Sequence, residues 1–160
     1  MSRGDDGYDP FAPGSRRYPR VIDQAEIDSL PVLKYSSGIE SAIFISRERD
    51  DARYFRQGVC TIEPDAEPYE WFASTFDESQ YCTEGVIRVE ASDADGRLVI
   101  LEAGPGEHLF LPAGYQYRWV PTGRRTTMLW TSGPSAPVGL SAREYGAQLV
   151  ASRGTGGGAE

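Results

Sequence analysis

Short apolar runs separated by turn-forming residues recur along the chain from about residue 40. The clearest run is Leu109-Phe110-Leu111, because Pro112 and Gly114 follow it directly and favour a tight turn. The same pattern predicts further strands over 42–45, 54–62, 70–76, 80–91, 97–102 and 126–131. Many short strands with a turn after each are typical of an all-β, antiparallel barrel or jelly roll.

Aromatic residues alternate along the strand that follows this turn. Tyr115, Tyr117 and Trp119 are spaced two apart. Since alternate side chains of a strand point to the same side, we expect these three rings on one face. An aromatic face of this kind fits the wall of a pocket for a planar or apolar small molecule.

Both ends of the chain lack the strand pattern. Residues 1–37 are rich in Gly, Pro and polar residues, which predicts a flexible arm with one helical turn capped by Asp23. The barrel is predicted over 38–133. Residues 134–160 predict a short helix, capped by Ser141, and a Gly-rich disordered tail.

Apolar residues of the arm have no obvious core partner. They are Tyr8, Phe11 and Ile22. Because exposed apolar patches tend to be covered by another subunit, we expect a homodimer.

Composition narrows the classes of function. The chain has 160 residues, enough for one domain, and a net charge of −8 that argues against binding nucleic acid or an anionic membrane. The sequence contains no run of about 18 apolar residues, so it predicts no membrane span. The N-terminus does not resemble a signal peptide. The two cysteines, Cys60 and Cys82, do not form a disulfide framework. These features indicate a cytoplasmic protein, and a bias for Arg over Lys suggests a GC-rich, bacterial genome.

Two motifs resemble those of the cupin superfamily, whose fold is a jelly-roll barrel. Gly106, five residues, Pro112-x-Gly114, two residues and then Tyr117 match the second motif, which usually ends in His. Upstream, Glu78 and Gly85 match the Glu and Gly of the first motif. The two His positions of that motif fall on Phe72 and Ser74, or on Trp71 and Ala73.

The resemblance is greatest to the ethanolamine-utilisation Q-type cupins. These share the run Thr75-Phe76-Asp77-Glu78-Ser79-Gln80-Tyr81 and the run Ala103 to Pro112. The resemblance covers about residues 55 to 133. It also raises an acetate-kinase-like activity, which we disfavour because no Gly-rich phosphate loop precedes a helix.

The metal ligands usual in cupins are absent. The only His, His108, does not occupy a ligand position of the motif. Glu70, Asp77 and Glu78 supply carboxylates but no nitrogen donors, which Fe, Mn, Ni and Zn sites of this fold use. We therefore expect no bound metal and no cofactor.

The remaining candidates for chemistry are a carboxyl group and a phenol. We expect Glu78 and Tyr117 to be catalytic, because an enclosed carboxyl group suits proton transfer and a phenol can stabilise developing charge. The expected substrate-binding residues are Phe72, Ser74, Gln80, Tyr81, Tyr115 and Trp119. The alternative for each is a structural role, since small barrels are normally filled by side chains.

Three functions follow from these residues. The first is a metal-independent enzyme that performs isomerisation, elimination or cyclisation on a small, apolar or aromatic metabolite. The second is an accessory protein that binds such a molecule without chemistry. The third, and least favoured, is a metal-dependent dioxygenase with atypical ligands. The fold alone does not separate them, because one scaffold hosts many functions.

Overall fold

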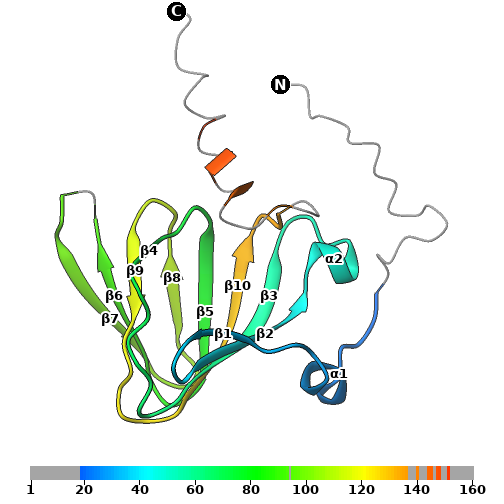
Figure 1. The fold of residues 1–160 in the computed structure, drawn as a ribbon, viewed down its shortest axis with the longest axis horizontal. Coiled ribbons are helices and arrows are strands. Elements are labelled where there is room, and N and C mark those ends of the chain that lie inside the picture. The colour runs from blue at the N-terminus through cyan, green and yellow to red at the C-terminus, as the bar shows by residue number, and fades with distance from the viewer. Residues whose placement is uncertain are drawn as a thin grey trace, which may run out of the picture.

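Two antiparallel sheets face each other in the computed structural model, which describes residues 19–93, 95–136, 140, 144–145, 147–148 and 151 (Figure 1). The six-stranded sheet has the order β1-β2-β3-β10-β5-β8, and the four-stranded sheet has the order β4-β9-β6-β7. The strands of the larger sheet are β1 (Leu33–Ser36), β2 (Ile39–Ile45), β3 (Arg56–Ile62), β5 (Asp77–Glu84), β8 (His108–Leu111) and β10 (Thr126–Gly133). Those of the smaller sheet are β4 (Phe72–Ala73), β6 (Ile87–Ser92), β7 (Leu98–Ala103) and β9 (Gln116–Trp119). This arrangement is the predicted jelly roll.

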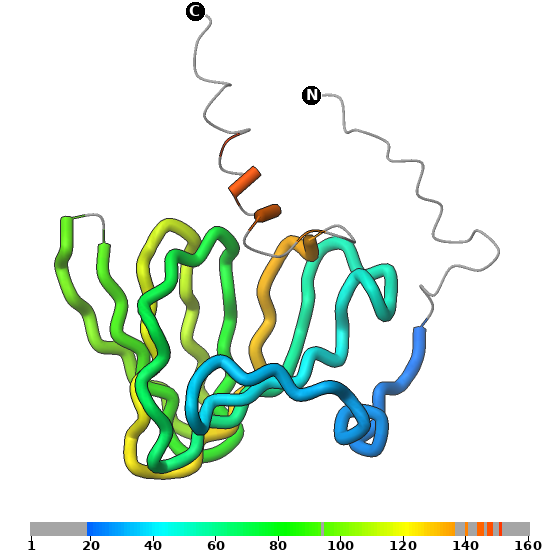
Figure 2. The backbone as a smooth tube through the Cα atoms, viewed as in Figure 1, coloured from blue at the N-terminus to red at the C-terminus, as the bar shows by residue number. Residues whose placement is uncertain are grey.

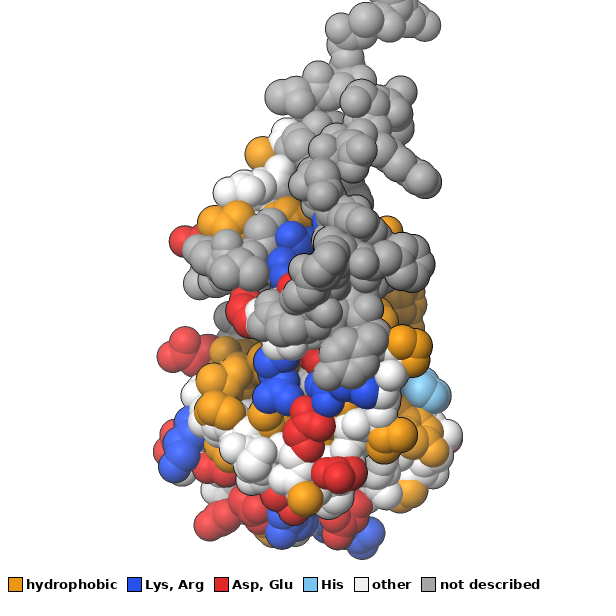
Figure 3. Space-filling model, turned by 90° about the vertical axis from the view of Figure 1, so that its right-hand side faces the viewer, with side chains coloured by type: hydrophobic (Ala, Val, Ile, Leu, Met, Phe, Trp, Pro, Cys, Tyr) orange, Lys and Arg blue, Asp and Glu red, His pale blue; other side chains and the backbone are white. Residues whose placement is uncertain are grey.

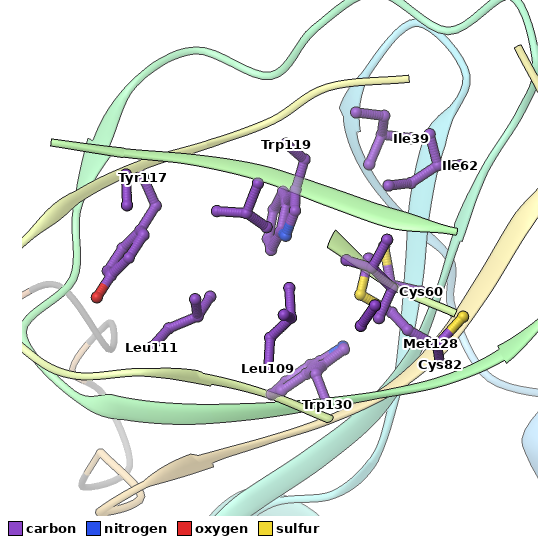
Figure 4. Packing of buried hydrophobic residues seen from close by; sticks show 14 of the residues in the cluster. Ile39, Cys60, Ile62, Cys82, Leu109, Leu111, Tyr117, Trp119, Met128 and Trp130 are labelled. Atoms are coloured by element: carbon purple, nitrogen blue, oxygen red, sulfur yellow. The ribbon is translucent and has the colours of Figure 1, made fainter. Parts of the chain in front are cut away.

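The core lies between the two sheets, as the alternating strand pattern predicts. Along β10, every second residue from Thr126 to Ser132 is buried, including Met128 and Trp130. Figure 4 shows Met128 beside Cys60 and Cys82, the two free cysteines of the larger sheet. Apolar side chains from both sheets therefore form one buried cluster.

The segment 80–91, predicted as one strand, is two strands in different sheets. Gly85 ends β5, and the chain then crosses to β6. Gly85 has φ of 74°, and a Cβ there would lie 2.3 Å from the carbonyl oxygen of Arg125. Only glycine combines this left-handed backbone with so close an approach, which explains why the apolar run is interrupted here.

Two other predicted boundaries differ from the structure. Of the segment 70–76, only Phe72–Ala73 forms a strand, because Ser74 donates its hydroxyl to the carbonyl oxygen of Phe76 and the chain turns. The larger sheet begins with β1 at Leu33, five residues before the predicted start of the barrel at residue 38. β1 pairs with β2, so the last part of the predicted arm belongs to the sheet.

The structure has two short helices near its N-terminal end, one before β1 and one between β2 and β3. α1 (Gln24–Asp28) is capped by Asp23, whose carboxylate accepts from the Glu26 N–H, as predicted. α2 (Arg47–Asp50) occupies the charged connection after β2. The predicted Ser141 cap, and Tyr8 and Phe11 of the arm, lie outside the described residues.

The connections between strands gather at the two ends of the barrel (Figure 2). On the face in Figure 3, charged side chains of both signs are interspersed with apolar ones. None of the helices that the structure describes is long and apolar enough to cross a membrane. Beyond β10, residues 144–145, 147–148 and 151 are helical, and the ring of Tyr145 lies 6.2 Å from that of Phe76.

Candidate active site

A cavity of about 760 Å³ lies within the barrel and receives side chains from both sheets. Aromatic rings form much of its wall. The Trp119 ring centre lies 5.3 Å from that of Phe72 and 5.4 Å from that of Tyr69, and Tyr35 lies 5.6 Å from Tyr69. The cavity is large enough for a small metabolite, and its walls combine aromatic rings with polar and charged side chains.

Glu78 is one of the few charged groups of this wall. It shares the inward side of β5 with Gln80 and Cys82, because these positions alternate with Ser79 and Tyr81. The Glu78 side chain is part-buried, and its Oε1 accepts from Gln80 Nε2 at 2.7 Å. Gln80 is itself completely buried, and its Oε1 accepts from Trp119 Nε1 at 3.2 Å. This chain of hydrogen bonds holds the carboxyl group in one orientation.

The environment of Glu78 favours its protonated form. Burial raises the pKa of the Glu78 carboxyl above its ordinary value, while the Gln80 hydrogen bond and the charge of Arg56 oppose this and lower it. Burial is the larger effect, so the carboxyl group keeps its proton to a higher pH than a carboxyl group in water. A group of this kind can both donate and accept a proton near neutral pH.

Arg56 is a second charged residue of the cavity and is not among the site residues predicted from the sequence. β10 pairs Ser132 opposite Arg56, and Arg56 Nε donates to Ser132 Oγ at 2.9 Å. The guanidinium lies 5.3 Å from the ring centre of Trp130, within the range of a cation–π contact. One feature of the sequence could have identified it: Arg56 alternates with the buried residues Gly58 and Cys60, so its side chain leaves β3 on the same side as theirs.

Tyr35 and Cys60 are two further titratable residues of the cavity wall. Burial raises the pKa of the Tyr35 phenol, and burial followed by the nearby Glu78 charge raises the pKa of the Cys60 thiol to about 12. Cys60 therefore stays a thiol at neutral pH and is not a ready nucleophile. Tyr35 was missed because the sequence placed it in the arm, but β1 brings it to the cavity.

Tyr117, predicted to be catalytic, does not line the cavity. It is 1% exposed, and its hydroxyl donates to the Pro112 carbonyl oxygen at 2.6 Å. Figure 4 shows Tyr117 at the opposite end of the cluster from Cys60, with its hydroxyl directed away from Trp130. Burial raises its pKa to about 12. Its side chain points to the inner side of β9, as predicted. It lies in the packed part of the barrel and not at the cavity.

The predicted binding residues divide into two groups. Phe72, Ser74 and Trp119 line the cavity with Glu78. Gln80 does not line it but donates a hydrogen bond to the Glu78 carboxyl group. Tyr115 and Tyr81, by contrast, are not among the residues that line the cavity.

Tyr115 lies away from the cavity because it precedes β9, and Tyr81 because its side chain leaves β5 on the outer side. Tyr115 precedes β9, is 39% exposed, and stacks on Tyr117 at 6.2 Å. Tyr81 has the outward parity of β5, and its ring centre lies 4.6 Å from that of His108 on β8. A regular strand cannot turn Gln80 and Tyr81 to the same side.

The residues at the metal-ligand positions do not fit the metal centre usual in this fold. Within the described ranges, no group of three or more His, Cys, Asp or Glu side chains could hold a metal ion. The two His positions fall on Phe72 and Ser74, or on Trp71 and Ala73, and none of these is a metal ligand; His108 is exposed on β8. Glu78 alone supplies one carboxylate, which leaves the nitrogen donors of such a centre unmatched.

Comparison with known proteins gives structural matches only. No model of a known protein family matches the chain, and no curated protein sequence matches it. Oxalate decarboxylase from Bacillus subtilis, solved at pH 4.6, superposes with a TM-score of 0.62 and 17% identity, over 79% of this chain and 33% of that one. A variant of the same enzyme gives a TM-score of 0.62 and 18% identity, over 82% and 34%. The EutQ protein of Clostridium difficile gives a TM-score of 0.48 and 16% identity, over 61% and 63%.

The oxalate decarboxylase matches define the class of the protein by its fold alone: the chain has the jelly-roll barrel of those structures. The chain spans about a third of the length of the oxalate decarboxylase it matches. Identities this low extend to the fold and not to the substrate or the reaction.

Proposed function

We propose that this protein is a metal-independent cupin enzyme in which Glu78 transfers protons to and from a small molecule held in the aromatic cavity. The observation that carries the proposal is the state of Glu78, a carboxyl group enclosed in the cavity and oriented through one oxygen only. Among the described residues, Gln80 is its one hydrogen-bond partner, so the second carboxyl oxygen is left to face a substrate.

The proposed step is a balanced proton transfer. The ionised Glu78 carboxylate removes a proton from one substrate atom, and the resulting carboxylic acid returns a proton to another atom. Such a cycle changes the position of a double bond, removes a leaving group or closes a ring without an oxidant or reductant. Arg56, on the same wall, would stabilise negative charge that develops on a substrate oxygen, the role predicted for Tyr117.

Hydrogen–deuterium exchange tests this proposal before the full reaction is identified. Small carbonyl compounds and carboxylic acids are incubated with the protein in D₂O, and NMR follows the loss of C–H signals. Glu78→Gln keeps the shape of the side chain but cannot exchange a proton, so it should slow exchange about 10²–10⁴-fold. Glu70→Gln is the matched control, because Glu70 also lines the cavity but is exposed. Equal exchange by wild type and Glu78→Gln would refute the proposal.

The accessory function is the second candidate, and one observation favours it. Trp119, Gln80 and Glu78 form a continuous hydrogen-bonded chain that would also hold a purely structural carboxylate in place. If compounds bind the wild-type protein in calorimetry and none exchanges a proton, the accessory function replaces the catalytic one.

A further inference from the structure

Arg56 gives the cavity a part-buried positive charge that no acidic side chain neutralises directly. Within the described part of the chain, Arg56 forms no salt bridge, although Glu78 is close enough for their charges to influence each other. Its Nε is occupied by Ser132, and its two terminal nitrogens meet no acceptor among the described residues. A part-buried guanidinium whose terminal N–H groups have no protein acceptor can donate charge-assisted hydrogen bonds to a bound anion.

The other titratable groups of the cavity do not change this balance. Tyr35, Tyr69 and Cys60 are neutral when protonated, and Glu70 lies at an exposed position of the wall. Glu78 is the one acidic group of the inner wall, so the inner cavity is neutral or positive depending on its proton. A ligand with one negative charge fits this field, and a polyanion does not.

The geometry selects the kind of anion. Because Nε donates to Ser132, the two terminal nitrogens are left for a ligand, and their two parallel N–H groups match the two oxygens of a carboxylate. The guanidinium carbon lies 5.3 Å from the ring centre of Trp130, so the rest of the ligand would lie along the Trp119 and Phe72 rings, which also line the cavity. Flat apolar groups pack well against such rings.

We propose that the cavity binds small carboxylates with a planar, apolar body, with the carboxylate on the terminal nitrogens of Arg56. This inference names the substrate class of the site and rests on the proposed function only for the claim that the cavity holds the ligand. Binding at Arg56 is separate from proton transfer at Glu78. The two claims therefore have separate tests.

Titration calorimetry with benzoate tests the inference, with benzamide as the uncharged probe of the same shape. We expect benzoate to bind and benzamide to bind at least about tenfold more weakly, since charged hydrogen bonds are stronger than neutral ones. Arg56→Gln should weaken benzoate binding about 10- to 100-fold. The control is Arg88→Gln on β6, because Arg88 pairs with Glu102 and does not line the cavity.

Two further variants keep the test decisive. Ser132→Ala removes the acceptor that orients the guanidinium and should weaken benzoate binding while the fold, followed by circular dichroism, is retained. If Arg56→Gln does not fold, Arg56→Lys, which keeps the charge but not the fork, should show the same direction of change. Equal affinity for benzoate and benzamide, unchanged binding in these variants, or no benzoate binding at millimolar concentration would each overturn the inference.

Glu78→Gln distinguishes this inference from the proposed function. We expect it to bind benzoate at least as tightly as wild type, because it removes the one nearby negative charge. Binding without any proton exchange on the compound panel would refute the catalytic proposal and leave the inference standing. Proton exchange without carboxylate binding would do the reverse.

Discussion

Replacing Gln80 by Leu should make the stability of this protein depend more strongly on pH. Gln80 is 0% exposed, accepts from the Trp119 indole and donates to Glu78. Leu has a similar size but can do neither. The indole N–H then loses its acceptor in a buried position, which costs about 1–3 kcal/mol at any pH.

The pH-dependent part comes from Glu78. Its pKa in the folded protein is raised above its ordinary value of 4.5, so the folded state holds a proton that the unfolded chain releases. That contribution to stability is complete below pH 4.5 and is lost as the pH rises through the folded pKa. The Gln80 bond lowers this pKa, and its removal raises it further, so the variant loses more stability than wild type as the pH rises. Hydrogen bonds to a charged group contribute about 1.5–3 kcal/mol, which is the expected additional loss.

Urea unfolding followed by tryptophan fluorescence, between about pH 4 and pH 8, measures this difference. The control is Gln57→Leu on β3, because Gln57 donates to the Thr131 hydroxyl at 2.8 Å and contacts no carboxylate through that bond. Its loss of stability should not change with pH. In a Glu78→Gln background, the pH-dependent part of Gln80→Leu should disappear. A constant difference between Gln80→Leu and wild type across this range, or one that persists without Glu78, would refute the reasoning.

Three shorter predictions concern stability and assembly. Tyr117→Phe removes a buried hydrogen bond to Pro112 and should lower the free energy of unfolding by about 0.5–1.5 kcal/mol without changing benzoate binding; a binding loss comparable to that of Arg56→Gln would return Tyr117 to the site. Gly85→Ala should destabilise far more than Gly96→Ala in thermal unfolding: both positions have positive φ, at a cost of about 1–2 kcal/mol, but a Cβ at Gly85 also meets the Arg125 carbonyl while one at Gly96 meets nothing. Equal losses would contradict the close approach. The homodimer expected from the sequence should appear in sedimentation at micromolar concentration, where a clean monomer would contradict it.

The sequence by itself determined the class of fold and four residues that line the cavity: Phe72, Ser74, Glu78 and Trp119. Alternation of apolar residues places side chains on one face of a strand whatever the neighbouring strands are. The strands of the jelly roll could therefore be predicted from short stretches of sequence. Glu78 was found because it follows the same rule and matches a motif with fixed spacing. The cap at Asp23 was also predictable, since it involves groups three residues apart.

The tertiary structure alone decided which inward-facing residues reach the cavity. Alternation gives the side of a sheet but not the depth along the barrel, which is why Tyr117 faces inward and yet packs in the core against Pro112. Arg56 became a site residue only when β10 brought Ser132 and Trp130 beside it, and Tyr35 only when β1 joined the larger sheet. These pairings join segments far apart in the sequence. A strand pattern read along the chain contains no information about them, because the energy that selects them comes from packing between the strands.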